Sequence, residues 1–168
     1  MEIKLIKGDI TRVECDAIVN AANKSLLGGG GVDGAIHRAA GPELLEECKA
    51  LDGCETGEAK ITKAYNLPSR FVIHTVGPVW HGGERGEAGL LKDCYLNSLK
   101  MAEEKELNSI AFPNISTGVY GYPKKEAAGI ALQTVWEFTP GSLKEVFFVV
   151  FDELNYKIYE ELLSKNLN

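Results

Sequence analysis

Two asparagines, an aspartate and a histidine surround a run of four glycines near the N-terminus. The glycines are Gly28–Gly31, and the polar residues are Asn20, Asn23, Asp33 and His37. Four consecutive glycines lose much backbone entropy on folding, so the run needs a compensating role. Backbone N–H groups without Cβ atoms can approach an anion at a helix N-terminus, where free donors and the helix dipole favour negative charge. A flexible surface loop is the alternative, but the flanking polar residues favour an anion site.

Asp33 precedes His37 by four residues, which is one turn of the helix expected at Ala35–Ala40. Their side chains can therefore meet on one face of that helix. Two interpretations stay open for Asp33. It caps the helix, as aspartate often does at such a place, while His37 packs against it. Or the pair acts on a substrate, which capping does not exclude.

Gly29, Gly31 and Gly34 fit the dinucleotide-binding pattern G-x-G-x-x-G. That pattern requires the glycines directly after a strand. Here Asn20–Leu27 separates the glycines from the strand expected at Ala17–Val19. The spacing therefore argues against a dinucleotide oxidoreductase. The phosphate-loop pattern G-x-x-x-x-G-K-[ST] is absent, so hydrolysis of a nucleoside triphosphate is not expected.

Two further turns contain groups suited to a nucleotide ligand. Ser116–Pro123, STGVYGYP, offers hydroxyls, two glycines and an aromatic ring that could hold a phosphate and stack on a sugar or base. An ordinary strand–helix turn explains this segment equally well. Asp9 follows the first expected strand, and its carboxylate could accept a hydrogen bond from an exocyclic amine such as adenine N6. Capping a turn is the commoner fate of such an aspartate.

Strands alternate with helices along the chain, which predicts an α/β fold with a sheet covered on both faces. Ligands of such sheets bind outside the carboxyl ends of the parallel strands. The two glycine-containing turns would then face each other across one cleft, and two anion-binding loops suggest a diphosphate. Strands are expected at Ile3–Leu5, Asp16–Val19, Glu58–Tyr65, Phe71–Val76, Ser109–Ile115 and Lys144–Phe151, and helices at Ala35–Ala40, Pro42–Leu51, Leu90–Glu106, Lys124–Phe138 and Asp152–Leu163.

Two other segments receive structural interpretations. His74 lies in the apolar run FVIHTV, and we expect it to be a buried histidine rather than a catalytic one. The segment His81–Gly89, HGGERGEAG, is expected to be a mobile, solvated loop.

Composition narrows the class of protein. The 168 residues suffice for one domain, 1–168, and the formal net charge is −6 without a cluster of lysine or arginine. Nucleic-acid binding through a basic surface is therefore not expected, and a bound phosphate must rely on backbone donors. Four cysteines without a C-x-x-C pair predict reduced thiols, and the three histidines lack ligand spacing for a metal. No leader or long apolar span is evident, so we expect a cytoplasmic protein without membrane insertion.

Five motifs in order resemble the macrodomain family, most closely its MacroD-type hydrolase branch. The likeness covers nearly the whole chain and implies a three-layer α/β/α sandwich around a six-stranded mixed sheet, with ADP-ribose as the ligand. Tyr120 is an aromatic residue that the family pattern permits. The motifs are Asp9-Ile10-Thr11, NAAN at 20–23, GGGGVDGAIHRAAG at 28–41, IHTVGPVW at 73–80 and ISTGVYGYP at 115–123.

The resemblance also implies roles for individual residues. Asn23 would meet the distal ribose, with Asp33 and His37 completing the catalytic side. Adenine would lie at Asp9 and the backbone of Ile10, near Phe151. Asn20 and Ala21 are further expected binding residues. The residues implied to enclose the diphosphate, with Tyr120 stacking near the distal ribose, are Gly29, Gly30, Gly31, Val32, Ser116, Thr117, Gly118, Val119 and Tyr120.

The function implied is an ADP-ribose-directed hydrolase. It would remove mono-ADP-ribose from acidic protein side chains and would deacetylate O-acetyl-ADP-ribose, without metal or cofactor. An oriented water suffices for such cleavage, with either Asp33 or a substrate phosphate oxygen taking the proton. The alternative is a non-catalytic module that binds ADP-ribose or ADP-ribosylated proteins. Relatives of that kind usually lack the asparagine and aspartate, so Asn23 and Asp33 favour an enzyme.

Overall fold

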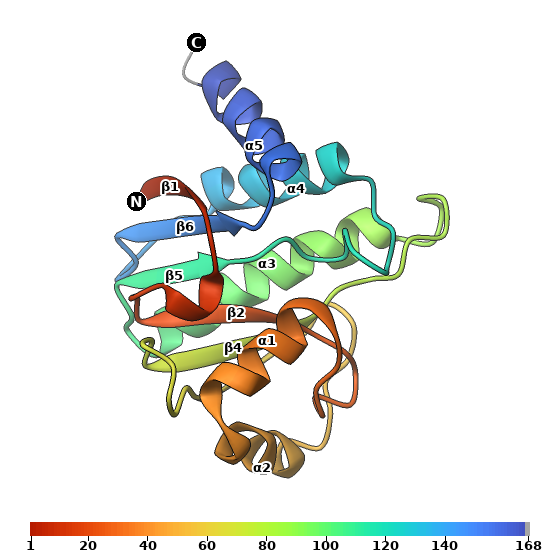
Figure 1. Cartoon of the computed structure of the whole chain (residues 1–168). Helices are drawn as coiled ribbons and strands as arrows, with labels where there is room; N and C mark the ends of the chain where they lie inside the picture. Colours follow the sequence, from red (N-terminus) through yellow and green to blue (C-terminus); the bar gives the residue numbers. More distant parts are fainter. Residues whose placement is uncertain (167–168) are drawn as a thin grey trace.

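In residues 1–166, the part of the chain that the computed structural model describes, six strands form one sheet in the order β1-β6-β5-β2-β4-β3 (Figure 1). Neighbouring strands run parallel except at β3, which pairs antiparallel with β4 and lies at one edge. The sheet is therefore mixed, as expected. The strands are β1 Glu2–Lys7, β2 Ala17–Ala22, β3 Ala59–Lys63, β4 Phe71–Val76, β5 Ser109–Phe112 and β6 Glu145–Val150.

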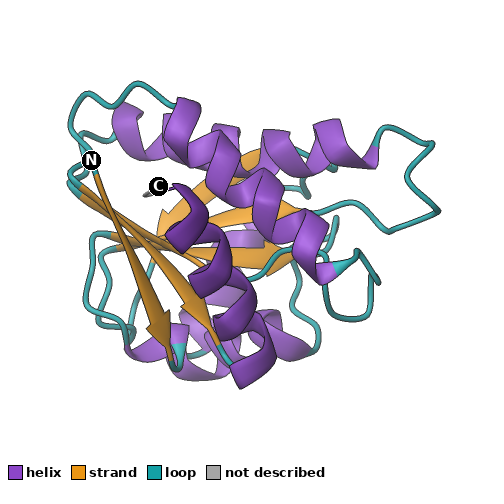
Figure 2. Cartoon of the chain, turned by 90° about the horizontal axis from the view of Figure 1, so that it is seen from above, coloured by secondary structure: helices purple, strands orange, loops and turns teal. Residues whose placement is uncertain are grey.

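Helices cover both faces of the sheet, as the view from above shows (Figure 2). α1 and α2 contribute buried side chains to the core on one face, and α3, α4 and α5 contribute to the core on the other. This arrangement confirms the predicted three-layer α/β/α sandwich. The helices are α1 Gly31–Ala40, α2 Pro42–Ala50, α3 Glu87–Glu104, α4 Lys124–Glu137 and α5 Glu153–Asn166, and a short 3-10 helix, η1, spans Ile10–Arg12.

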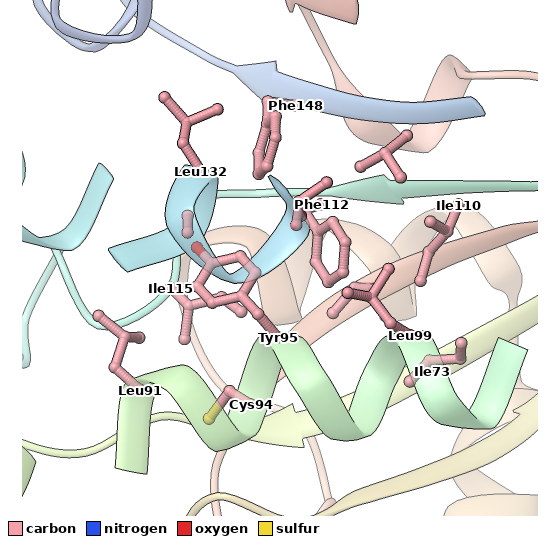
Figure 3. Packing of buried hydrophobic residues seen from close by; sticks show 14 of the residues in the cluster. Ile73, Leu91, Cys94, Tyr95, Leu99, Ile110, Phe112, Ile115, Leu132 and Phe148 are labelled. Carbon is pink, nitrogen blue, oxygen red and sulfur yellow. The ribbon is translucent and has the colours of Figure 1, made fainter. Parts of the chain in front are cut away.

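Aromatic rings fill the larger core, between the sheet and α3, α4 and α5. Tyr95 of α3 lies 5.0 Å from Phe112 of β5, measured between ring centroids, and Phe112 lies 5.9 Å from Phe148 of β6 (Figure 3). The ring of Tyr159 extends the cluster to α5, 5.1 Å from Phe148. Full burial of one such side chain contributes about 1.5–3 kcal/mol to the free energy of folding, so this aromatic cluster stabilises the packing of the helices on the sheet.

α1 begins and ends at glycines. Gly30 is its N-cap and Gly31 its first residue, while Gly41, with φ 90°, ends it by donating its N–H to the carbonyl of His37. Pro42 then starts α2 at a position where a missing N–H costs nothing. The predicted helix start at Ala35 was wrong by one turn, because α1 already begins at Gly31, the last glycine of the run.

Other sequence-based boundaries were wrong as well. β2 continues past Val19 to Ala22, so Asn20 and Ala21 lie within the sheet. β5 ends at Phe112 instead of Ile115, because Pro113 follows and has no N–H for a ladder. β3 ends at Lys63, short of the predicted Tyr65, and pairs antiparallel with β4.

The segment His81–Gly89 is not a solvated loop throughout. α3 starts within it at Glu87, whose side chain is only 1% exposed. The Glu87 carboxylate accepts hydrogen bonds from the backbone N–H groups of His81, Gly83 and Arg85, at 2.8, 2.9 and 2.6 Å. These bonds, that from His81 first, lower the pKa of Glu87 to about 2. A single buried carboxylate therefore fixes the segment that the composition suggested to be mobile.

The four cysteines are free thiols, as predicted. Burial raises the pKa of Cys48 and Cys94 to about 11 and that of Cys15 to about 12. Among the helices of residues 1–166, none has the length and apolar character needed to cross a membrane.

Candidate functional site

A cavity of about 790 Å³ opens at the carboxyl ends of β1, β2, β5 and β6. This is the edge at which parallel α/β sheets bind ligands. Both glycine-containing loops line it, so the prediction that they face one cleft is confirmed. The lining residues are Gly8, Asp9, Ile10, Ala21, Ala22, Asn23, Gly29, Gly30, Gly31, Val32, Asp33, Ala35, Arg38, Gly77, Pro113, Asn114, Ser116, Thr117, Gly118, Val119, Tyr120, Val149 and Phe151.

Asp33 is a buried carboxylate with two different oxygen environments. Its Oδ1 atom accepts a hydrogen bond of 2.9 Å from the side-chain amide of Asn20 and lies 3.4 Å from Nε2 of His37. Its Oδ2 atom faces Gly29, where an ideal Cβ would lie 3.2 Å from it. Burial raises the pKa of Asp33, while the Asn20 hydrogen bond and the His37 charge oppose the rise. The carboxylate is thus anchored through one oxygen and directs the other toward the glycine loop.

The structure shows whether Asp33 caps α1. The N-cap of α1 is Gly30, and Asp33 lies in the first turn without a capping hydrogen bond. The capping interpretation was therefore wrong. The predicted meeting of Asp33 and His37 across one helical turn is confirmed at 3.4 Å.

Asn23 holds the loop that leads into the glycine run. Its Nδ2 atom donates to the carbonyl of Gly28 at 2.8 Å, and its Oδ1 atom accepts from the hydroxyl of Ser25 and the N–H of Leu26. An ideal Cβ at Gly29 would lie 3.4 Å from Nδ2. A side-chain amide has two N–H donors, so one of them is left for a ligand, and Asn23 lines the cavity.

Gly34, which follows the glycine run, is required because α1 and the glycine loop approach each other closely at this residue. An ideal Cβ at Gly34 would lie 2.5 Å from the carbonyl oxygen of Gly29 and 3.0 Å from Nη1 of Arg38. Any side chain at position 34 would therefore push α1 away from the loop. The missing side chain also lets the Arg38 guanidinium lie along the helix toward its N-terminus, where it lines the cavity.

The second loop, Ser116–Tyr120, is held mainly by its backbone. The N–H of Tyr122 donates to the carbonyl of Ser116, and that of Trp80 donates to the carbonyl of Tyr120, both at 2.9 Å. Ser116 has φ 67°, a conformation that non-glycine residues adopt at some cost, and its Oγ has no partner among residues 1–166. At the loop tip Val119 is fully exposed.

The opposite end of the cavity contains Asp9, Ile10 and Phe151. Asp9 is the N-cap of η1 and accepts hydrogen bonds from the N–H and the hydroxyl of Thr11 at 2.9 and 2.7 Å. These bonds, that of the hydroxyl first, lower its pKa. The turn-cap interpretation of Asp9 is thus confirmed, and contact with a base stays a prediction. Phe151 is 84% exposed beside it.

The structure brings most predicted site residues to the cavity, but two lie behind its wall. Asn20 is fully buried in β2, and His37 contacts Asp33 without lining the cavity. Sequence reasoning missed Arg38, the one cation among the cavity residues that the structure describes, and Asn114. Arg38 could have been found from its spacing of four residues from Gly34.

We compared the chain with known protein families, sequences and solved structures. The Macro domain family model matches residues 19–131. A Macro domain-containing protein of Chlorobaculum tepidum is 61% identical, covering 96% of this chain and 95% of that protein. A protein of Escherichia fergusonii named O-acetyl-ADP-ribose deacetylase is 58% identical, covering 97% and 96%. A solved variant of the Oceanobacillus iheyensis macrodomain with ADP-ribose has a TM-score of 0.93 and 50% identity, covering 97% of this chain and 92% of the other. The chain belongs to the Macro domain family.

Proposed function

We propose that this protein is an ADP-ribose-directed hydrolase that deacetylates O-acetyl-ADP-ribose and removes mono-ADP-ribose from acidic side chains of proteins. The observation that carries the proposal is that two polar atoms, both from residues that line the cavity, approach one position beside Gly29. The Asp33 Oδ2 atom and the Asn23 Nδ2 atom lie 3.2 and 3.4 Å from the same ideal position beside Gly29. The names of two similar proteins, O-acetyl-ADP-ribose deacetylase, support the first activity.

The placement of the ligand follows from the chemistry of the cavity wall. The adenine end lies at Asp9, whose second carboxylate oxygen can accept from an exocyclic amine, and against the exposed ring of Phe151. The diphosphate lies between Gly29–Val32, at the N-terminus of α1, and Ser116–Tyr120. The distal ribose then reaches Asn23 and Asp33, because Asp33 would repel the phosphates and accepts from sugar hydroxyls instead.

The reaction adds one water molecule across an ester of the distal ribose and yields ADP-ribose and a carboxylic acid. Oδ2 of Asp33 orients the water and takes one of its protons while the water oxygen bonds to the acyl carbon of the ester. The bond between that carbon and the ribose oxygen then breaks, the water oxygen stays in the released acid, and the proton passes from Asp33 to the ribose oxygen. Burial supports this role, because it raises the pKa of Asp33 and so makes the ionised carboxylate a stronger base. Asn23 holds the ribose with its free N–H donor.

The test is turnover by the wild-type protein. O-acetyl-ADP-ribose and a protein mono-ADP-ribosylated on glutamate are each incubated with it, and released acetate and ADP-ribose are measured. The proposal predicts release from both substrates. Binding of ADP-ribose in calorimetry without release from either would identify a reader module instead. Release from the acetylated nucleotide alone would restrict the function to deacetylation.

A further inference from the structure

A row of polar side chains crosses the apolar face of the sheet under α1 and α2. Asn20 of β2 and His74 of β4 are partners in the parallel register, and Thr62 of β3 lies on the same face next to them. All three are buried, with exposed fractions of 0%, 0% and 2%. Their neighbours on this face are apolar, among them Val72 and Leu44. Such a row is costly in an apolar layer unless its members bond to one another.

Hydrogen bonds connect the row to Asp33. The Thr62 hydroxyl lies 2.9 Å from Nε2 of His74, and Nδ1 of His74 lies 3.2 Å from the Asn20 amide nitrogen. That same nitrogen donates to Oδ1 of Asp33 at 2.9 Å. The row therefore runs from the edge strand of the sheet to the carboxylate that faces the cavity.

The donors and acceptors of the row permit one arrangement of protons. The Asn20 nitrogen has two hydrogens, and with one on Asp33 the other points at Nδ1 of His74, which must then be an acceptor. The proton of the neutral imidazole is consequently on Nε2 and is donated to the Thr62 hydroxyl. Burial favours this neutral state, because it lowers the pKa of His74 to about 3, with the His37 charge acting in the same direction.

The opposite tautomer would disturb the carboxylate. A proton on Nδ1 of His74 would turn the Asn20 amide and bring its oxygen toward Oδ1 of Asp33, where two acceptors repel. The observed orientation leaves Asn20 Oδ1 buried without a partner among residues 1–166. An orphaned acceptor costs stability, and an apolar side chain at position 20 would avoid that cost. Packing of the core alone therefore does not explain why these polar side chains are buried here.

We propose that Thr62 and His74 are positioning residues for the reaction assigned to this site, and that they act through Asn20 to hold Oδ1 of Asp33 so that Oδ2 faces the substrate. The inference rests on the proposed function. Neither residue lines the cavity, so neither contacts the ligand directly. Their effect is on the orientation of a reacting group, which alters the catalytic step and leaves binding unchanged.

Thr62 offers a matched pair of variants. Thr62→Val keeps the shape and removes the hydroxyl, whereas Thr62→Ser keeps the hydroxyl and removes a methyl group. We expect Thr62→Val to lower kcat by about 3- to 10-fold with unchanged KM, the range for one net hydrogen bond, and Thr62→Ser to retain most of the wild-type kcat. A purely structural role predicts the reverse order, because valine suits a buried apolar face better than serine. Thr134→Val, on α4 at the other face, is the control for the same chemical change.

The pH profile and the imidazole spectrum give two independent readouts. In Thr62→Val the proton on Nε2 of His74 loses its acceptor, which favours the opposite tautomer and the turned Asn20 amide. The turned amide no longer donates to Asp33, and loss of this hydrogen bond raises the pKa of Asp33. The acid limb of kcat should therefore move to higher pH in Thr62→Val. The other titratable groups near Asp33 are His37 on the same helix and Cys48 on α2. Long-range proton–nitrogen spectra of the wild type, which has three histidines, should show His74 neutral with its proton on Nε2.

The outcomes separate this inference from the proposed function. Equal kcat in Thr62→Val and Thr62→Ser, a loss confined to KM, or a proton on Nδ1 of His74 would overturn the positioning role while wild-type turnover stands. No turnover by the wild type would overturn the proposed function, and the positioning role with it.

Discussion

The two glycine-containing loops of the cavity are held in different ways. Side chains fix the first: Asn23 bonds to Gly28 and Leu26, and buried Asn20 anchors Asp33 behind it. Backbone hydrogen bonds fix the second loop, Ser116–Tyr120, and its tip is fully exposed at Val119. The first loop therefore presents polar atoms in fixed positions, as a catalytic step requires, whereas the second offers a backbone surface suited to enclosing a ligand.

The difference extends to how each loop connects to the rest of the protein. The first is connected to the centre of the sheet through β2 and the polar row behind Asp33. The second is connected, through the bond between Trp80 and Tyr120, to the segment that Glu87 holds. Substitutions near the first loop should therefore affect the rate, and substitutions near the second should affect stability or binding. The four predictions that follow, from the largest expected effect to the smallest, test this division and the end of the cavity at Asp9.

Asp33→Ala should lower kcat by about 10²- to 10⁴-fold, the usual contribution of a general acid–base group. The affinity for ADP-ribose should change little, because the lost interaction is strongest in the transition state. Single-turnover release of ADP-ribose and calorimetric binding, measured on the same preparation, check this. Glu160→Ala, an exposed carboxylate on α5, is the control. Equal losses in rate and binding would mean that the first loop binds and does not catalyse.

Asp9→Ala should weaken ADP-ribose binding by about 1.5–3 kcal/mol, the scale of a hydrogen bond to a charged group. Because Asp9 also caps η1, the substitution alone cannot separate base contact from local structure. An inosine analogue of the ligand separates them in the wild type, since its O6 would face the carboxylate as a second acceptor. Equal affinity of the wild type for the adenosine and inosine forms would leave Asp9 as a cap only.

Glu87→Gln should lower Tm at neutral pH, because one amide oxygen replaces a charged acceptor of three N–H groups. The folded-state pKa of Glu87, about 2, lies below its ordinary value of 4.5. Its contribution to stability is therefore complete above pH 4.5 and is lost as pH falls toward 2. The Tm difference between wild type and variant should shrink over that range. A difference that is constant from pH 6 to pH 3 would show that the charge of Glu87 does not hold the segment.

Salt should weaken ADP-ribose binding only slightly. Arg38 is the one cation that lines the cavity within residues 1–166, and the loops offer backbone N–H groups to the phosphates. A plot of log affinity against log salt should therefore have a much smaller slope than proteins with several lysine or arginine contacts to phosphate show. Calorimetry from low to high salt measures it. A steep slope would assign the diphosphate to side-chain cations rather than to the glycine loops.

Much of the cavity could be predicted because its residues occupy loops at strand ends, where glycines and polar side chains are visible in the sequence. Asn20 could not be assigned its place, because that depended on β2 continuing to Ala22. The role of Glu87 was hidden as well, since three backbone donors leave no pattern among side-chain types. The spacing of Arg38 from Gly34 is visible in the sequence, but that its guanidinium lines the cavity depends on how α1 packs against the glycine loop, which the sequence does not show.

The exposed aromatic ring and the exposed branched side chain that line the cavity have a thermodynamic consequence. Phe151 is 84% exposed and Val119 fully exposed, although both line the cavity. A ligand that covers them removes apolar surface from water, and removal of apolar surface lowers the heat capacity. Binding of a charged, strongly hydrated nucleotide should thus have a negative heat-capacity change, and its enthalpy should become more favourable as the temperature rises.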